Sequence, residues 1–217
     1  GIAETMAREQ MKVTITSRHF QEAQEAARHL VILGAESALA LECDVRDFES
    51  QQRVVKEILQ DWGHLDVVIA NAGVGYFGAI DTMAQNQWHE IMDTNLTGVF
   101  YTLQASVDAL KASKGYLITI ASLAGANFFA NGAAYNASKF GLVGFTQAAM
   151  LDLRPYGIKV STIMPGSVAT YFNNHTPGSA DAWKIQPEDI GQIVTDLLKM
   201  NPRTLPSKIE VRPSMPA

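Results

Sequence analysis

The sequence predicts one α/β domain, a doubly wound parallel sheet covered by helices on both faces in three α/β/α layers. Short apolar or β-branched runs alternate along the chain with longer helical patterns, as expected for this class. The apolar runs are mostly continuous, as in parallel strands that are buried on both faces. With 217 residues, of which 47% are hydrophobic, the chain is long enough for one domain with a sizeable core.

Six apolar runs are expected to form strands, and helices are expected between them. Right-handed crossovers between consecutive strands would place these helices on both faces of the sheet. No internal repeat or interdomain linker interrupts the pattern, so residues 1–217 are expected to form a single domain. The expected strands are residues 13–17, 38–42, 67–70, 116–121, 159–164 and 208–211.

The first three helices are marked by composition and by their ends. Residues 1–9 have a helical composition, and residues 21–33 are rich in Ala, Glu and Gln. The second segment stops before Gly34, and the helical pattern over residues 49–62 stops before Gly63. Glycine is the usual residue just past the end of a helix, so both stops are well defined.

The later helices are marked by periodicity and by their first turns. Residues 96–110 repeat apolar side chains close to the 3.6-residue period of a helix. Residues 133–153 are rich in Ala and Gly, which lets helices pack closely. Residues 187–200 open with Pro-Glu-Asp, which suits a first helical turn.

The least regular stretch, residues 171–186, follows the expected strand at 159–164. Sixteen irregular residues in a compact domain are more typical of a functional loop than of a plain connection. We therefore expect a substrate loop there. Aromatic residues that are candidates for an apolar pocket are Tyr171, Phe172 and Trp183 in this loop, and Phe128 and Phe129 elsewhere.

Charge and composition argue against several classes of function. The net charge of −5, with acidic and basic residues interspersed, gives no electrostatic footprint for nucleic acid or an anionic membrane. No apolar run approaches the roughly 18 residues of a membrane span. The five histidines lack metal-ligand spacing, so no metal site is expected. Cys43 is the only cysteine, which excludes an intramolecular disulfide and fits a reducing, cytoplasmic compartment.

The strongest chemical signal is the segment Tyr135-Asn136-Ala137-Ser138-Lys139. A spacing of four places Tyr135 and Lys139 on one face of a helix. A nearby ammonium favours the phenolate and lowers the phenol pKa from its usual value of about 10. A tyrosine tuned in this way can exchange a proton with a carbonyl oxygen. Alone, the pair is also typical of a surface lysine beside a half-buried tyrosine.

Several polar or glycine-containing segments follow the expected strands, where the carboxyl ends of an open α/β sheet meet the binding crevice. Ser122 follows the strand at 116–121, and Asn71-Ala72-Gly73 follows the strand at 67–70. Pro165-Gly166 follows the strand at 159–164, with Thr170 shortly after it. Asn95 heads the helix expected at 96–110, where it suits a helix N-cap.

Together with Asp44-Val45 and Asn95-Leu96-Thr97-Gly98, these pieces resemble the short-chain dehydrogenase/reductase family, in its single-domain Tyr-x-x-x-Lys branch. The resemblance covers nearly the whole chain and implies a Rossmann-like fold. It also implies an oxidoreductase that moves hydride between a nicotinamide cofactor and a small carbonyl or alcohol substrate.

The resemblance implies a role for each of four catalytic positions. Tyr135 would be the general acid in reduction and the base in oxidation. Lys139 would lower the pKa of that tyrosine and bind the nicotinamide ribose. Ser122 would polarise and orient the carbonyl. Asn95 would hold a water on a proton path from Lys139, a role that does not exclude the N-cap role.

The resemblance also implies cofactor contacts spread along the chain. Asp44 and Val45 would flank the adenine. The remaining implied positions lie along the adenosine, at the pyrophosphate and at the nicotinamide: Gly1, Ile2, Asn71, Ala72, Gly73, Tyr135, Lys139, Pro165, Gly166, Val168 and Thr170.

The end of the strand at 13–17 favours NADP over NAD. An acidic residue there would bond the ribose 2′-hydroxyl and repel a 2′-phosphate. This chain has Ser17-Arg18 instead. A hydroxyl and a guanidinium suit a phosphate, because arginine binds phosphate through two parallel hydrogen bonds. Alternatively, Arg18 is a solvated surface charge.

The start of the chain departs from the family pattern. Family members carry a first strand and a Thr-Gly-x-x-x-Gly-x-Gly turn, which cradles the pyrophosphate at the following helix N-terminus. Gly1-Ile2 resembles the end of that turn, with Ala3 where its last glycine usually lies. We expect about a dozen or more further residues upstream, by analogy with the family. Without them, two strand edges should be unpaired.

Two other classes of function stay open at this point. One is a dinucleotide-binding protein that senses cofactor without catalysis, against which the Ser122, Tyr135 and Lys139 set argues. The other is a structural or interaction protein that binds no cofactor. The resemblance implies a homodimer or homotetramer that pairs through the helices at 96–110 and 133–153.

Overall fold

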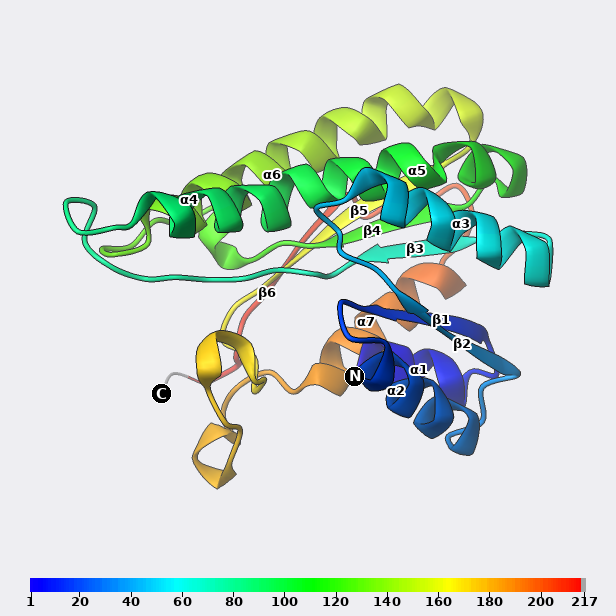
Figure 1. Ribbon diagram of the computed structural model, residues 1–217, viewed down its shortest axis with the longest axis horizontal. Coiled ribbons are helices and arrows are strands. Elements are labelled where there is room, and N and C mark those ends of the chain that lie inside the picture. Colours follow the sequence, from blue (N-terminus) through cyan, green and yellow to red (C-terminus); the bar gives the residue numbers. More distant parts are fainter. Residues whose placement is uncertain (216–217) are drawn as a thin grey trace.

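Six parallel strands run through the middle of the molecule, and helices cover them on two sides (Figure 1). The computed structural model describes residues 1–215. The expected α/β fold with a parallel sheet and flanking helices is confirmed, and each strand lies within one residue of its expected bounds. The strands are β1 (Lys12–Ser17), β2 (Ser37–Glu42), β3 (Val67–Ala70), β4 (Tyr116–Ile120), β5 (Lys159–Pro165) and β6 (Lys208–Val211).

The hydrogen-bonded sheet consists of two parts within residues 1–215. β1 pairs with β2, and the other four strands pair in the order β3-β4-β5-β6, all in parallel. The edges of β1 and β3 that face away from these partners are unpaired in the described chain, as the sequence led us to expect. The hydroxyl oxygen of Thr14 on β1 is buried and has no hydrogen-bond partner among the described residues. By contrast, β4 and β5 are almost completely buried.

The helices form two layers. Helices cover both faces of the sheet (Figure 1). The upper layer consists of α3 (Phe48–Trp62), α4 (Gln85–Met92), α5 (Gly98–Ser113) and α6 (Ala133–Leu153). The lower layer consists of α1 (Ile2–Arg8), α2 (Phe20–Ile32) and α7 (Pro187–Lys199).

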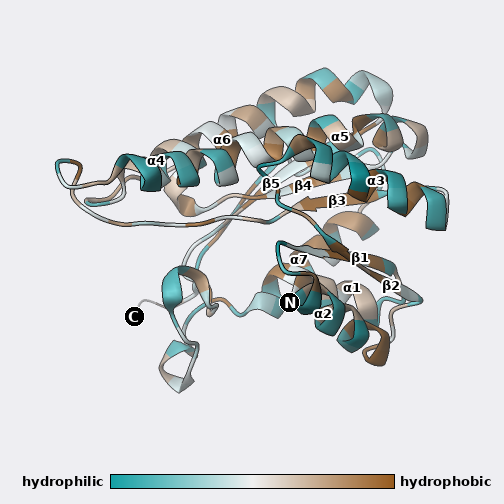
Figure 2. Ribbon diagram, in the orientation of Figure 1, coloured by the Kyte–Doolittle hydropathy of each residue, from teal (hydrophilic) through white to brown (hydrophobic). Residues whose placement is uncertain are grey.

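The core follows the two helical layers. Leu110, Leu117 and Leu142 belong to a buried cluster between α5, α6 and the sheet. Ile118, Ile163 and Val194 belong to a second cluster, between the other face of the sheet and α7. Figure 2 shows apolar residues on β1 and β3, and largely hydrophilic outer faces on α2 and α3. This distribution is what burial of apolar surface as the main driving force of folding requires.

The region before α5 differs from expectation. α4, which the sequence analysis did not predict, runs into a π-helical turn at Asp93–Thr97 and then into α5. Asn95 therefore lies inside a continuous helical segment, and the N-cap role is wrong, since an N-cap residue has non-helical backbone angles. The π-turn is a rare feature that is frequent at functional sites.

The loop expected at 171–186 is largely irregular, with short 3₁₀ turns at Phe172–Asn174 and Ser179–Asp181. Its carboxylate Asp181 accepts hydrogen bonds from Lys184 Nζ at 2.6 Å, from the Gly178 amide at 2.9 Å and from His175 Nε2 at 2.8 Å. These bonds, which hold the pKa of Asp181 far below its usual range, close the loop on itself.

Candidate active site

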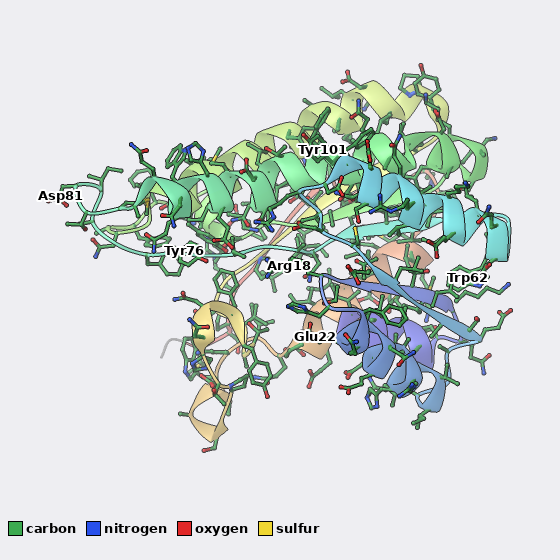
Figure 3. The ribbon with its side chains drawn as sticks, in the orientation of Figure 1. Arg18, Glu22, Trp62, Tyr76, Asp81 and Tyr101 are labelled. Carbon is green, nitrogen blue, oxygen red and sulfur yellow. The ribbon has the colours of Figure 1, made fainter. Side chains whose placement is uncertain are left out.

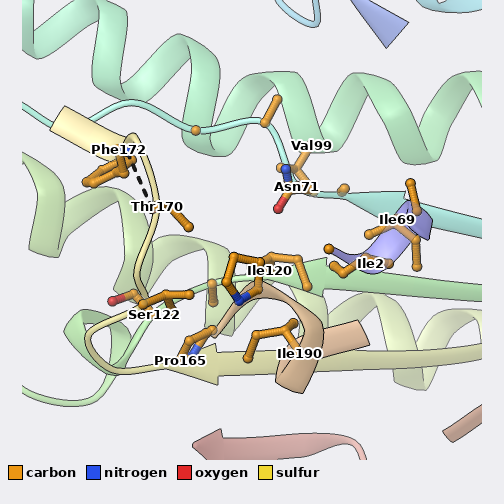
Figure 4. A pocket seen from close by; sticks show the side chains of 18 of the residues that line it. Ile2, Ile69, Asn71, Val99, Ile120, Ser122, Pro165, Thr170, Phe172 and Ile190 are labelled. Atoms are coloured by element: carbon orange, nitrogen blue, oxygen red, sulfur yellow. Dashed lines mark hydrogen bonds between the residues drawn. The ribbon is translucent and has the colours of Figure 1, made fainter. Parts of the chain in front are cut away.

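A cavity of about 1600 Å³ opens at the carboxyl ends of the strands and continues between β1 and β3. Figure 4 shows Asn71, Ser122, Pro165 and Thr170 around it, contributed by segments far apart in the sequence. The predicted site residues that line this cavity are Gly1, Ile2, Val45, Asn71, Ala72, Gly73, Ser122, Tyr135, Lys139, Pro165, Gly166, Val168 and Thr170.

The remaining predicted cofactor residues lie outside that cavity. Arg18 and Asp44 line a second cavity of about 590 Å³, and Arg18 lies between the end of β1 and the segment of Tyr76 (Figure 3). The Ser17 hydroxyl donates to Glu22 Oε2 at 2.9 Å. Asp44 accepts from Arg46 Nε at 2.9 and 3.1 Å, and these bonds hold the pKa of that carboxyl below its usual value.

Tyr135 and Ser122 meet at the carboxyl end of β4. Tyr135, in the first turn of α6, is 9% exposed, and Ser122 lies two residues beyond the end of β4. Burial raises the pKa of the Tyr135 phenol, and the neighbouring Ser122 hydroxyl partly opposes this rise. The Ala124 amide donates to Ser122 Oγ at 3.1 Å. This bond uses an acceptor position of Ser122 and leaves its own proton available as a donor.

Lys139 lies one turn further along α6 and is 4% exposed. Its Nζ donates to the Ile120 carbonyl at 3.1 Å and lies 5.7 Å from the centre of the Tyr135 ring. Burial lowers the pKa of Lys139 to about 8. Burial dominates and raises the pKa of Tyr135, so the lowering of that pKa by Lys139 stays a prediction.

The pKa of Lys139 predicts a pH-dependent stability. Because its folded value of about 8 lies below the unfolded value of about 10.4, the unfolded chain binds more protons between these limits. Below pH 8, burial of the protonated Lys139 lowers the free energy of unfolding by its full amount. This destabilisation disappears as the pH rises from 8 toward about 10.4, because the buried amine is then neutral. Relative to Lys139→Met, the wild-type free energy of unfolding should rise by about 3 kcal/mol between pH 7 and pH 10.5.

Urea unfolding of both proteins at the two pH values measures this change. Lys56→Met, at an exposed position of α3, is the matched control and should not show it. A difference between wild type and Lys139→Met that stays constant with pH would contradict the prediction.

Asn95 does not line the cavity but is bonded to segments that do. Fully buried, it accepts from the Val74 amide at 2.8 Å and donates to the Val74 carbonyl at 2.9 Å and to Ser138 Oγ at 3.1 Å. Ser138 Oγ in turn donates to the Tyr135 carbonyl at 2.8 Å. Asn95 thus connects the loop after β3 to the turn of α6 that carries Tyr135. Its predicted role in holding a water stays a prediction.

Two functional neighbours escaped the sequence analysis. Asn136 Nδ2 donates to the carbonyls of Ala124 at 2.7 Å and Asn127 at 2.8 Å, so it fixes the loop that begins at Ser122. Phe77, from the loop after β3, packs against the Tyr135 ring. The position of Asn136 inside the Tyr-x-x-x-Lys segment was the available signal for it, whereas no local pattern pointed to Phe77.

The residues present fit a nicotinamide dinucleotide. An ammonium has three donors, and within residues 1–215 Lys139 uses one of them on the Ile120 carbonyl. Lys139 also lines the cavity, where ribose hydroxyls would accept the remaining bonds. Within the same residues, no cluster of three His, Cys, Asp or Glu side chains could hold a metal ion. No helix in this part of the chain is long and apolar enough to cross a membrane.

Comparison with known proteins gives a consistent picture. Residues 1–179 match the family model described as short chain dehydrogenase. The chain is 39% identical to a trans-4-hydroxycyclohexanecarboxylate dehydrogenase of Sinomonas cyclohexanicum, over 64% of this chain and 53% of that protein. It is 30% identical to a putative ketoacyl reductase of Streptomyces coelicolor, over 96% of this chain and 81% of that protein.

Solved structures agree. An alcohol dehydrogenase from Thermococcus sibiricus complexed with 5-hydroxy-NADP superimposes with a TM-score of 0.92 at 27% identity, covering 100% of this chain and 92% of that one. A metagenomic short-chain oxidoreductase in complex with NADP gives 0.85 at 32% identity, covering 99% and 91%.

Proposed function

This chain belongs to the short-chain dehydrogenase family, and from that premise we propose an NADP-dependent carbonyl reductase or alcohol dehydrogenase with Tyr135 as its general acid and base. One observation carries the proposal. Tyr135, Ser122 and Lys139 converge on one cavity at the carboxyl end of β4. That position is where ligands bind in open α/β sheets.

In reduction, a bound reduced nicotinamide supplies the hydride. Ser122 donates its hydroxyl proton in a hydrogen bond to the carbonyl oxygen and fixes it beside Tyr135. Tyr135 transfers its phenolic proton to that oxygen as negative charge develops there. In oxidation, the same phenol oxygen accepts the proton of the alcohol. The hydrogen bond from Ala124 to Ser122 holds the serine oxygen in place for both directions.

Lys139 has two tasks in this proposal. With its pKa of about 8, its side chain is largely protonated at neutral pH. The ammonium stabilises the Tyr135 phenolate that forms when the proton leaves. Its remaining N–H groups would bind the ribose hydroxyls of the nicotinamide cofactor. The burial of both side chains strengthens this electrostatic effect, because fewer water molecules screen it.

NADP is the proposed cofactor because Arg18 follows β1, where an acidic residue would favour NAD. Its guanidinium would pair with the 2′-phosphate. Asn71, Ala72 and Gly73 would line the adenosine, and the other proposed contacts are Gly1, Ile2, Ser17, Asp44, Val45, Pro165, Gly166, Val168 and Thr170. The NADP complex of the metagenomic oxidoreductase, at 32% identity, supports this choice.

The test is the oxidation of NADPH and of NADH over a panel of ketones and aldehydes. We expect turnover with NADPH, and kcat/KM at least about tenfold lower with NADH, which corresponds to about 1.4 kcal/mol. Equal use of both cofactors would contradict the NADP assignment. Tight NADPH binding without turnover on any carbonyl would instead favour a cofactor-sensing protein.

We also propose a cytoplasmic homodimer or homotetramer that pairs through α5 and α6. Phe100, Phe140 and Leu151 on these helices are exposed large apolar side chains, which supports an interface there. Sedimentation as a monomer at micromolar concentration would contradict this assembly.

A further inference from the structure

Two phenylalanines from separate segments pack against the ring of Tyr135, and a third packs against one of them. The Phe77 ring lies 5.4 Å from the Tyr135 ring at 70°, and the Phe172 ring lies 5.8 Å from it at 53°. Phe129 extends the group, with its ring 5.9 Å from that of Phe77 at 52°. All three line the large cavity. We call Phe77, Phe129 and Phe172 the aromatic wall.

Two glycines make room for the aromatic wall. A Cβ atom at Gly75, which is buried, would lie 2.6 Å from Cζ of Phe172 and 3.2 Å from Cζ of Phe77. A Cβ atom at Gly132 would lie 2.5 Å from Cε2 of Phe129. Since real Cβ atoms do not approach so closely, these rings occupy space that only glycine leaves open.

The segments that carry the wall are fixed from outside it. Val74, next to Gly75, is held by two hydrogen bonds to the Asn95 side chain. Phe172 follows Thr170, whose hydroxyl accepts from the Phe172 amide at 3.4 Å (Figure 4). The loop beyond it is closed on itself around Asp181. Hydrogen bonds outside the aromatic wall therefore hold the segments of Phe77 and Phe172 in place.

The wall is nevertheless only half covered. Phe172 is 38% exposed, Phe77 is 42% exposed and Phe129 is 48% exposed. Large apolar side chains that remain exposed in a cavity, next to polar groups that can orient a ligand, are typical of binding sites. Aromatic rings prefer tilted or edge-to-face contacts, which the wall already makes with Tyr135 and can repeat with a ligand.

We propose that the aromatic wall selects carbonyl substrates in which a planar apolar ring is bonded to the reacting carbon, with Phe172 as a specificity-determining residue. The proposal rests on the function proposed above. The carbonyl oxygen lies between Ser122 and Tyr135, and the ring then packs against the wall. A flexible alkyl chain of the same size gains less, because it loses rotational freedom on binding and makes no ring–ring contact.

The test compares acetophenone with 2-octanone, two ketones of equal carbon number, and with acetone as a small reference. With NADPH and wild-type enzyme, we expect kcat/KM for acetophenone to exceed that for 2-octanone by about tenfold or more. Equal or better use of 2-octanone would overturn the proposal.

Two variants assign the effect to the wall. Phe172→Leu should lower kcat/KM for acetophenone about fivefold to tenfold and leave acetone within about twofold. Gly75→Ala should act in the same way, because its methyl group displaces the Phe172 ring. The double variant should lose no more than Phe172→Leu alone, since both changes act on one contact.

Phe128→Leu is the matched control, because Phe128 is 85% exposed and adjoins the wall residue Phe129. If Phe172→Leu behaves like this control, Phe172 does not determine specificity. Saturation-transfer NMR of acetophenone with the NADP⁺-loaded protein keeps the test independent of turnover. Loss of the acetophenone signal in Phe172→Leu supports binding of the ring by the aromatic wall, even if no carbonyl is reduced. Absence of carbonyl reduction would contradict the proposed reaction and not the aromatic wall. An unchanged signal overturns the wall.

Discussion

Replacing Tyr135 with phenylalanine should lower kcat for carbonyl reduction by about 10²- to 10⁴-fold, the range that a positioned general acid contributes. The change removes the only group of Tyr135 that can give a proton to the substrate oxygen. The ring keeps its packing against Phe77 and Phe172, so the site should keep its shape. NADPH binding should remain within about threefold, because Lys139 and the other residues that line the cavity are unchanged.

Steady-state NADPH oxidation and calorimetric cofactor binding measure these two quantities separately. Tyr171→Phe is the matched control: Tyr171 is 76% exposed in the loop next to Phe172, and the change removes the same hydroxyl. The control should retain activity within about twofold. A Tyr135→Phe enzyme with near-normal kcat would remove Tyr135 from its role as general acid.

The second large effect is expected for Ser122→Ala. In the proposed reaction the Ser122 hydroxyl donates to the oxygen on which charge develops, and the Ala124 amide holds Ser122 Oγ in place. Removing one such donor typically costs about 10²- to 10³-fold in kcat. The effect should fall on kcat more than on KM, because the bond strengthens as the oxygen becomes negative.

Ser167→Ala provides the matched control, since Ser167 lines the same cavity and the change removes the same atom. It should alter kcat less than threefold, roughly 0.6 kcal/mol. An effect of Ser122→Ala that appears only in KM would show that the hydroxyl holds the ground state and not the developing charge.

The elements of the fold were largely predictable because their signals are local. The strand at Val67–Ala70 and the helix at Ala133–Leu153 have the bounds expected from the sequence. Gly63, at the end of α3, has the positive φ that glycine adopts without strain. Continuous apolar runs and helix stops depend only on neighbouring residues, so they can be recognised without the tertiary structure.

Other features were hidden because their causes lie far apart in the chain. α4 is a short helix with few apolar residues, and its union with α5 through the π-turn placed Asn95 inside a helix. The pKa of Tyr135 depends on how deeply the folded chain buries it, and the spacing to Lys139 says nothing of burial. The sequence also could not show that Arg18 and Asp44, which are distant in the chain, line a second cavity together.

The α/β class, the family and the residue types that could perform the chemistry follow from the amino-acid sequence, because periodicity, glycine stops and motif spacing are properties of neighbouring residues. Three features needed the folded chain: the bonds of Asn95 to Val74, the space that Gly75 leaves for the Phe172 ring, and the effect of burial on the pKa values of Tyr135 and Lys139. Those outcomes depend on distance and desolvation between segments that are separated along the chain, and a linear pattern carries neither quantity.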